Sequence, residues 1–323
     1  MTYVAAAHGK PFREPVRADL LGGKAFRQAL ARAAEDDEVE HRDWGATMVS
    51  LKLAEPEHLF DAAGTLRNEG PVGFYAHGTR RLYVRGRQIT PYVRMILVHE
   101  LTHAWQDQWY DLDGVYYGTD DDSAMATKAL IEGDATRIQL RWLAGQSAAD
   151  QASIRAADQP LHDAETRAAR SLTALGEFPY AAGVRFAEAV AERGGNAAIE
   201  RAFFHPPAST EQVLHPEKYF EDDRPDHVDV WDHDRVFAVD SGVLGELVLS
   251  LVVDDDEVAG WDGDYYVTTD DGDDLCTHVS VRMDTRADRD RLAAALRRVA
   301  TGDSDVYAED DRDLGFSFCV PSS

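Results

Sequence analysis

Three things are scarce in this sequence: cysteine, lysine and long apolar runs. Among 323 residues there are two cysteines, Cys276 and Cys319, and neither has the spacing of a metal site. They could form one disulfide or remain two buried thiols. No apolar run approaches the roughly 18 residues that a transmembrane helix needs. The first residues lack an apolar core long enough for a secretory signal, so we expect a cytoplasmic protein, or an exported one if a leader is missing from the sequence.

The shortage of lysine is part of an unusual charge balance. Lysine accounts for five of the 33 basic residues, which face 59 Asp and Glu residues and leave a net charge of −26. The acidic surplus is spread over the whole chain. Screening at molar ionic strength would relieve the self-repulsion, so the composition favours adaptation to high salt. A protein made for a cationic partner is the alternative, and the same charge argues against a nucleic-acid partner.

What the sequence does contain is centred on residues 92–110, which read YVRMILVHELTHAWQDQWY. Neither proline nor glycine interrupts this stretch, which predicts one long buried helix. His99 and His103 are four residues apart, so both project from one face of such a helix and can bind one zinc ion. Glu100 can then reach a metal-bound water as general base. The alternative is a chance arrangement of two core histidines and a surface glutamate.

A third zinc ligand is expected, because a catalytic zinc usually has three protein ligands and a water. Residues 123–143 read SAMATKALIEGDATRIQLRWL and predict a second helix with Ser123 as its N-cap. Glu132 lies in its middle among apolar neighbours, where a carboxylate is costly unless it is paired or binds a metal. The small residues Gly133 and Ala135 would let this helix approach the first one closely. An exposed glutamate on an amphipathic helix is the alternative.

The stretch HELTHAWQDQ followed by ALIEGDAT resembles the gluzincin zinc metallopeptidases, specifically a bacterial and archaeal branch with an EGDA second helix. Residues 73–84, 178–183 and 206–219 also fit that branch, so the resemblance covers roughly 71–219. It implies a mononuclear zinc site with His99, His103 and Glu132 as ligands and Glu100 as base. It does not imply a particular substrate.

Residues 73–85, GFYAHGTRRLYVR, predict a β-hairpin just before the zinc helix. In gluzincin-like folds such a strand forms the upper edge of the cleft and pairs with an extended substrate through main-chain hydrogen bonds. An ordinary core strand is the alternative.

A zinc peptidase also needs a donor for the oxyanion that develops on the attacked carbonyl. His215 is the candidate, with Tyr219 and Tyr180 behind it, because gluzincins commonly use a histidine or tyrosine of the lower lobe. A helix-terminal histidine bound to a backbone carbonyl is the alternative.

Residues 178–193 predict a further helix, with Pro179 near its start and Gly194 and Gly195 closing it.

We therefore expect an α+β protein with two parts. Residues 1–225 would form a mainly helical, zincin-like metallopeptidase core, made of an N-terminal segment (1–70), the edge hairpin (73–85) and the zinc helices (92–110 and 123–143). Residues 236–323 would form a small C-terminal α/β lobe. The expected function is zinc-dependent hydrolysis of a peptide or protein substrate. The alternative is an inactive descendant that binds a peptide or a partner.

Overall fold

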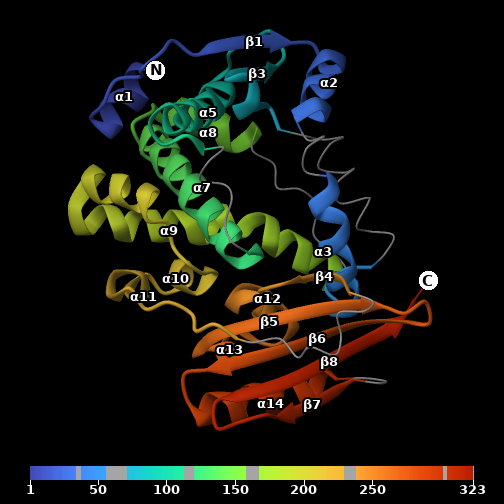
Figure 1. Ribbon diagram of the computed structural model, residues 1–323. Helices are drawn as coiled ribbons and strands as arrows, with labels where there is room; N and C mark the ends of the chain where they lie inside the picture. The colour runs from blue at the N-terminus through green and yellow to red at the C-terminus, as the bar shows by residue number, and fades with distance from the viewer. Residues whose placement is uncertain are drawn as a thin grey trace.

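The computed structural model describes residues 1–33, 38–55, 71–112, 120–157, 167–228, 238–300 and 304–322. It is a mixed α/β structure, with a helical part stacked on a β-sheet and a second, smaller sheet at the opposite end (Figure 1). In chain order the elements are α1 (Thr2–His8), β1 (Arg17–Leu21), α2 (Gly23–Ala33), α3 (Glu38–Ser50), β2 (Gly73–Ala76), η1 (His77–Thr79), β3 (Arg81–Arg85), α5 (Pro91–Tyr110), α7 (Asp121–Ala144), α8 (Ala148–Ala157), α9 (Arg167–Phe204), α10 (Thr210–Leu214), α11 (Pro216–Glu221), β4 (Ala238–Gly242), α12 (Gly245–Val252), α13 (Asp255–Val258), β5 (Trp261–Asp270), β6 (Asp274–Met283), α14 (Arg286–Val299), β7 (Asp305–Ala308) and β8 (Asp313–Pro321).

Helix α5 begins and ends where its terminal residues dictate. Thr90 is the N-cap, its side chain accepts the Val93 N–H, and Pro91 occupies the first turn, where a missing N–H costs nothing. At the other end Asp111 takes a left-handed conformation, and its N–H bonds to the Asp107 carbonyl. The helix therefore covers the stretch expected from the sequence and carries the H-E-x-x-H residues in its middle.

Helix α7 begins earlier than expected. Its N-cap is Asp120, whose carboxylate accepts the Ser123 N–H, while the Ser123 hydroxyl accepts the Asp120 N–H in a reciprocal capping box. Ser123 is therefore the third residue of the helix and not its N-cap. The acidic residues 120–122 favour this start, because negative charge is stabilised near a helix N-terminus.

Helix α9 also differs from expectation, because it runs continuously across Pro179. Only Gly194 and Gly195 interrupt its helical backbone, and Gly195 has a positive φ of 60° that glycine adopts without strain. The backbone therefore leaves helical geometry at the glycine pair that was predicted to close the 178–193 helix, and α9 resumes beyond it. The close partner of Gly133 is α9 and not α5: a Cβ at Gly133 would lie 2.1 Å from the Gly183 carbonyl oxygen.

The two sheets lie at opposite ends of the helical part (Figure 1). The smaller one has the order β1-β3-β2, in which β1 is parallel and β2 antiparallel to the central β3. The predicted hairpin is formed by β2 and β3, and β2 is an edge strand. The larger sheet has the order β4-β5-β6-β8-β7, with every neighbouring pair antiparallel.

Helix α3 connects the N-terminal part of the chain to the larger sheet. It packs against β4, β6 and β8, and its Ser50 and Thr47 hydroxyls bond to Thr277 and Thr268 of that sheet. One hydrophobic cluster extends from α5, α7 and α9 to Phe316 and Phe318 of β8. Among the described residues the hydrophobic core is therefore continuous across the expected boundary at 225–236, much of which lies outside the described residues.

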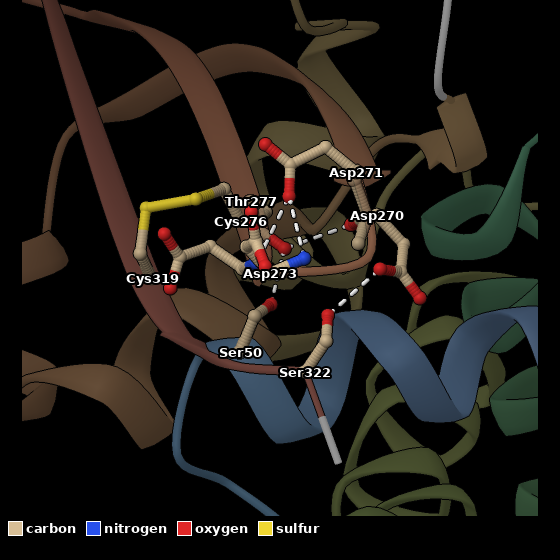
Figure 2. The surroundings of a disulfide bond; sticks show 10 residues. Ser50, Asp270, Asp271, Asp273, Cys276, Thr277, Cys319 and Ser322 are labelled. Carbon is tan, nitrogen blue, oxygen red and sulfur yellow. Dashed lines mark hydrogen bonds between the residues drawn. A yellow bond between two sulfur atoms is a disulfide. The ribbon is translucent and has the colours of Figure 1, made fainter.

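The two cysteines form a disulfide between neighbouring strands. Cys276 of β6 is directly opposite Cys319 of β8, and the bond lies close to the end of α3 that carries Ser50 (Figure 2). Of the two possibilities left open by the sequence, the structure therefore has the bridge. None of the described helices combines the length and apolar character needed to cross a membrane.

Candidate metal centre

Helices α5 and α7 bring the three predicted zinc ligands together. The Nε2 atoms of His99 and His103 are 3.0 Å apart, and the Glu132 Oε2 atom lies 3.1 Å from the first and 3.2 Å from the second. All three side chains are buried, with at most 8% of each residue exposed. They are the one group of three potential metal ligands found within the part of the chain that the structure describes.

The spacing of these atoms fits a tetrahedral zinc. Ligand atoms about 2.0–2.2 Å from zinc are roughly 3.4 Å apart when the geometry is tetrahedral. The three observed separations of 3.0–3.2 Å are close to this value and would need only a slight expansion. Two imidazoles and one carboxylate are also a donor set that zinc takes in catalytic sites.

Two glutamines orient the histidine rings. The Nδ1 atom of His99 lies 3.0 Å from Gln139 Oε1, and the Nδ1 atom of His103 lies 3.0 Å from Gln106 Oε1. An oxygen accepts, so each Nδ1 carries the proton and each Nε2 keeps its lone pair for a metal. Sequence reasoning missed both glutamines. The available signal was spacing, since Gln106 is one helical turn after His103, and Gln139 is two turns after Glu132 on the same helix.

Glu132 and His103 shift each other's pKa strongly. Burial alone would lower the pKa of His103, but the Glu132 carboxylate raises it to about 9. Burial alone would raise the pKa of Glu132, yet His103 and His99 hold it well below its usual range. These shifts place a second ring proton on His103, at Nε2, beside an ionised Glu132, and Nε2 offers its lone pair to a metal only after losing it. Metal binding must release it, because metal ligands bind in their deprotonated form.

Glu100 faces the edge strand β2. Its Oε2 atom accepts the Tyr75 N–H at 2.8 Å, and the Tyr75 hydroxyl donates to Asp107, one of the buried residues of α5. Tyr75 thus fixes β2 to two points on α5. Burial raises the pKa of Glu100, while His99, His103 and the Tyr75 N–H oppose this rise. A raised pKa brings a carboxylate closer to the range in which a general base works at neutral pH.

His215 does not join this site through any described contact. It ends α10, and its Nε2 atom lies 3.1 Å from Glu246 of α12. The start of α10 is fixed to the first turn of α7, where Asp122 accepts the Thr210 N–H and hydroxyl. Asp122 precedes Glu132 by ten residues, about 15 Å along a helix. These contacts hold the start of α10 at the first turn of α7, and they leave the assignment of His215 as oxyanion donor a prediction.

The two reserve candidates have different positions. The Tyr219 hydroxyl donates to the His205 carbonyl, and its ring packs on Phe186, so its contacts are those of a structural residue. Tyr180 of α9 lies beside the site, with its ring centre 6.1 Å from that of His99 and 43% of the residue exposed. Of the three residues considered from the sequence, Tyr180 is the one that contacts a ligand.

Comparison of the chain with family models, with curated proteins and with solved structures found no match.

Proposed function

We propose that the protein is a zinc-dependent peptidase. The observation that carries the proposal is the convergence of the His99, His103 and Glu132 ligand atoms, with Glu100 directly after His99 on α5. This donor set, with a glutamate next to the first histidine, matches the pattern on which the resemblance to gluzincins rests.

The chain's own residues would divide the reaction among them. A bound zinc would polarise the scissile carbonyl and lower the pKa of a water molecule. The Glu100 carboxylate would take a proton from that water and deliver it to the leaving nitrogen, as a C–O bond forms and the C–N bond breaks. Tyr180, at the edge of the site, would donate a hydrogen bond from its hydroxyl to the negatively charged oxygen.

The edge strand β2 supplies a place for an extended peptide. Tyr75 directs its N–H away from β3 and toward Glu100, so the main-chain groups of Gly73 and Tyr75 face the outer edge, and Phe74 and Ala76 face β3. A peptide added at this edge would lie beside the metal ligands. A bound peptide would replace Glu100 as the acceptor of the Tyr75 N–H hydrogen bond or share that N–H with it.

The charge and the disulfide bear on where the enzyme works. The net charge of −26 supports activity at molar salt, where screening removes the repulsion. A disulfide is typical of oxidising compartments and uncommon in the cytosol, so the Cys276–Cys319 bond favours export over the expected cytoplasmic location. Thiol labelling of freshly isolated native protein tests this: two reactive thiols without reductant would contradict it.

The experiment is cleavage of a broad peptide library at molar salt by the zinc-loaded protein, with Glu100→Gln as the matched variant. The substitution keeps the shape of the side chain and removes the base. We expect Glu100→Gln to retain zinc and to lose turnover by about 10²–10⁴-fold. Zinc binding by the wild type without cleavage of any peptide would refute the peptidase and favour the binding protein.

A further inference from the structure

Behind His103 lies a buried polar cluster that the reaction does not use directly. It consists of Gln106, Asp134, Arg137 and His8, all buried, with at most 4% of any residue exposed. Asp134 follows the ligand Glu132 by two residues on α7. Its Oδ1 atom pairs with Arg137, one turn later, at 2.6 Å.

The partners of Gln106 leave its amide one orientation. Its nitrogen donates to the Ile131 carbonyl at 3.2 Å and to Asp134 Oδ2 at 3.0 Å. Both partners are acceptors, so a reversed amide would place its oxygen against two other oxygens. The Gln106 oxygen must therefore face the Nδ1 atom of His103, which lies 3.0 Å away. An oxygen in that position selects the ring tautomer with its proton on Nδ1.

We propose that Gln106 and Asp134 are positioning residues that fix the Nδ1–H tautomer of His103 and so direct its Nε2 lone pair at the metal. The proposal rests on the proposed zinc site. It makes α7 responsible for two functions: Glu132 binds the metal, and Asp134 orients the amide that holds the ligand of the other helix. The Arg137 guanidinium pairs with the Asp134 carboxylate, so the buried carboxylate can stay charged while it accepts from Gln106.

His8 closes the cluster from the side of α1. Its ring stacks on Trp105 with centres 3.8 Å apart, and its Nε2 atom lies 3.8 Å from Asp134 Oδ2 with no hydrogen-bond partner. At this distance His8 covers Asp134 without competing for the oxygen that Gln106 uses. The N-terminal helix thus shields the cluster from water.

The test uses four variants and one control. Gln106→Leu removes the amide. Gln106→Glu and Asp134→Asn each change one member of the Gln106–Asp134 hydrogen bond, so that its donor and acceptor no longer match. The double variant Gln106→Glu/Asp134→Asn exchanges amide and carboxylate. The new carboxylate can accept from His103, and the new amide can donate to it while its oxygen still accepts from Arg137. One carboxylate oxygen then faces the Ile131 carbonyl, so the exchange restores only part of the network. Gln108→Leu is the control, because Gln108 contacts the backbone of Arg13 and Glu14 and not the site.

Zinc affinity is measured by competition with a chromogenic chelator, and exchange of the His103 Nδ1 proton by NMR in the metal-free protein. We expect Gln106→Leu to weaken zinc binding by about 10–100-fold and to expose the Nδ1 proton to exchange. The double variant should recover part of the affinity lost by either single variant, which a merely structural role would not produce. Gln108→Leu should retain both properties of the wild type.

Two results would overturn the proposal. One is Gln106→Leu with wild-type zinc affinity and a protected Nδ1 proton. The other is a double variant whose affinity is no better than that of the single variants. Failure of the proposed function would appear differently: the wild type would bind no zinc, while exchange of the Nδ1 proton would still report whether Gln106 holds His103.

Discussion

The crossing of α7 and α9 offers a sharp test of how the metal site is supported. A Cβ added at Gly133 would lie 2.1 Å from the Gly183 oxygen, and one added at Gly183 would lie 2.1 Å from the Ala129 oxygen. Both obstacles are backbone atoms, which cannot turn aside as a flexible side chain can. Gly133→Ala must therefore push the two helices apart by about 1 Å or more, because cores are close-packed.

Two opposing effects set the change in the free energy of unfolding that Gly133→Ala causes. Overpacking a tight core costs about 1–3 kcal/mol and sometimes more, and a clash with backbone belongs at the upper end. The higher helix propensity of alanine compared with glycine stabilises the folded state by about 1 kcal/mol. We expect Gly133→Ala to lower the free energy of unfolding by about 2 kcal/mol or more. Because Glu132 is the neighbouring residue, zinc affinity should fall as well.

Gly176→Ala is the matched control on α9, because a Cβ there would meet nothing within 4 Å. It should raise the free energy of unfolding by about 0.5–1 kcal/mol through helix propensity alone. Urea titration at constant molar salt measures the free energy of unfolding of both variants. An unchanged slope of this free energy with urea concentration shows that only the stability has changed. If Gly133→Ala proved as stable as Gly176→Ala, the close approach of the two helices would be refuted.

Three further predictions concern the oxyanion donor, the response to salt and His215. Tyr180→Phe should lower turnover by about 10²–10³-fold at unchanged zinc affinity, whereas unchanged turnover would remove Tyr180 from the mechanism. The melting temperature should rise from low to molar potassium chloride, and a flat or falling curve would contradict adaptation to salt. The hydrogen bond to Glu246 raises the pKa of His215, so its stabilising charge is complete below the unfolded pKa of about 6.5 and is lost as pH rises through the folded pKa. His215→Ala should therefore cost up to about 1 kcal/mol at pH 6 and less at pH 9, without affecting zinc affinity, and an equal cost at both would refute the charged pair.

The sequence was most informative where chemistry depends on local spacing. His99 and His103 are four residues apart, and one helix is enough to bring them together. Glu132 could be singled out because a carboxylate among apolar residues needs a partner. The hairpin could be predicted from its β-prone residues and turn. In each case the signal lies within one element or its immediate neighbours.

Features that depend on which elements meet could not be predicted. Gly133 was expected to allow close packing of α7 against α5, but it packs against Gly183, which is 50 residues away on α9. His215 was chosen because its segment fits the family pattern, whereas the contact between Asp122 and Thr210, which shows which end of α7 carries α10, could not be read from the sequence. The orientation of Gln106 likewise requires Asp134, a partner on another helix.

The most direct test of the account is the zinc content of the purified protein and its affinity for zinc, compared with those of Glu132→Ala. We expect the wild type to bind one zinc ion per chain, to release a proton on binding, and to lose most of its affinity when Glu132 is replaced. A wild-type protein that binds no zinc, or a Glu132→Ala variant that binds it as tightly as the wild type, would contradict the account.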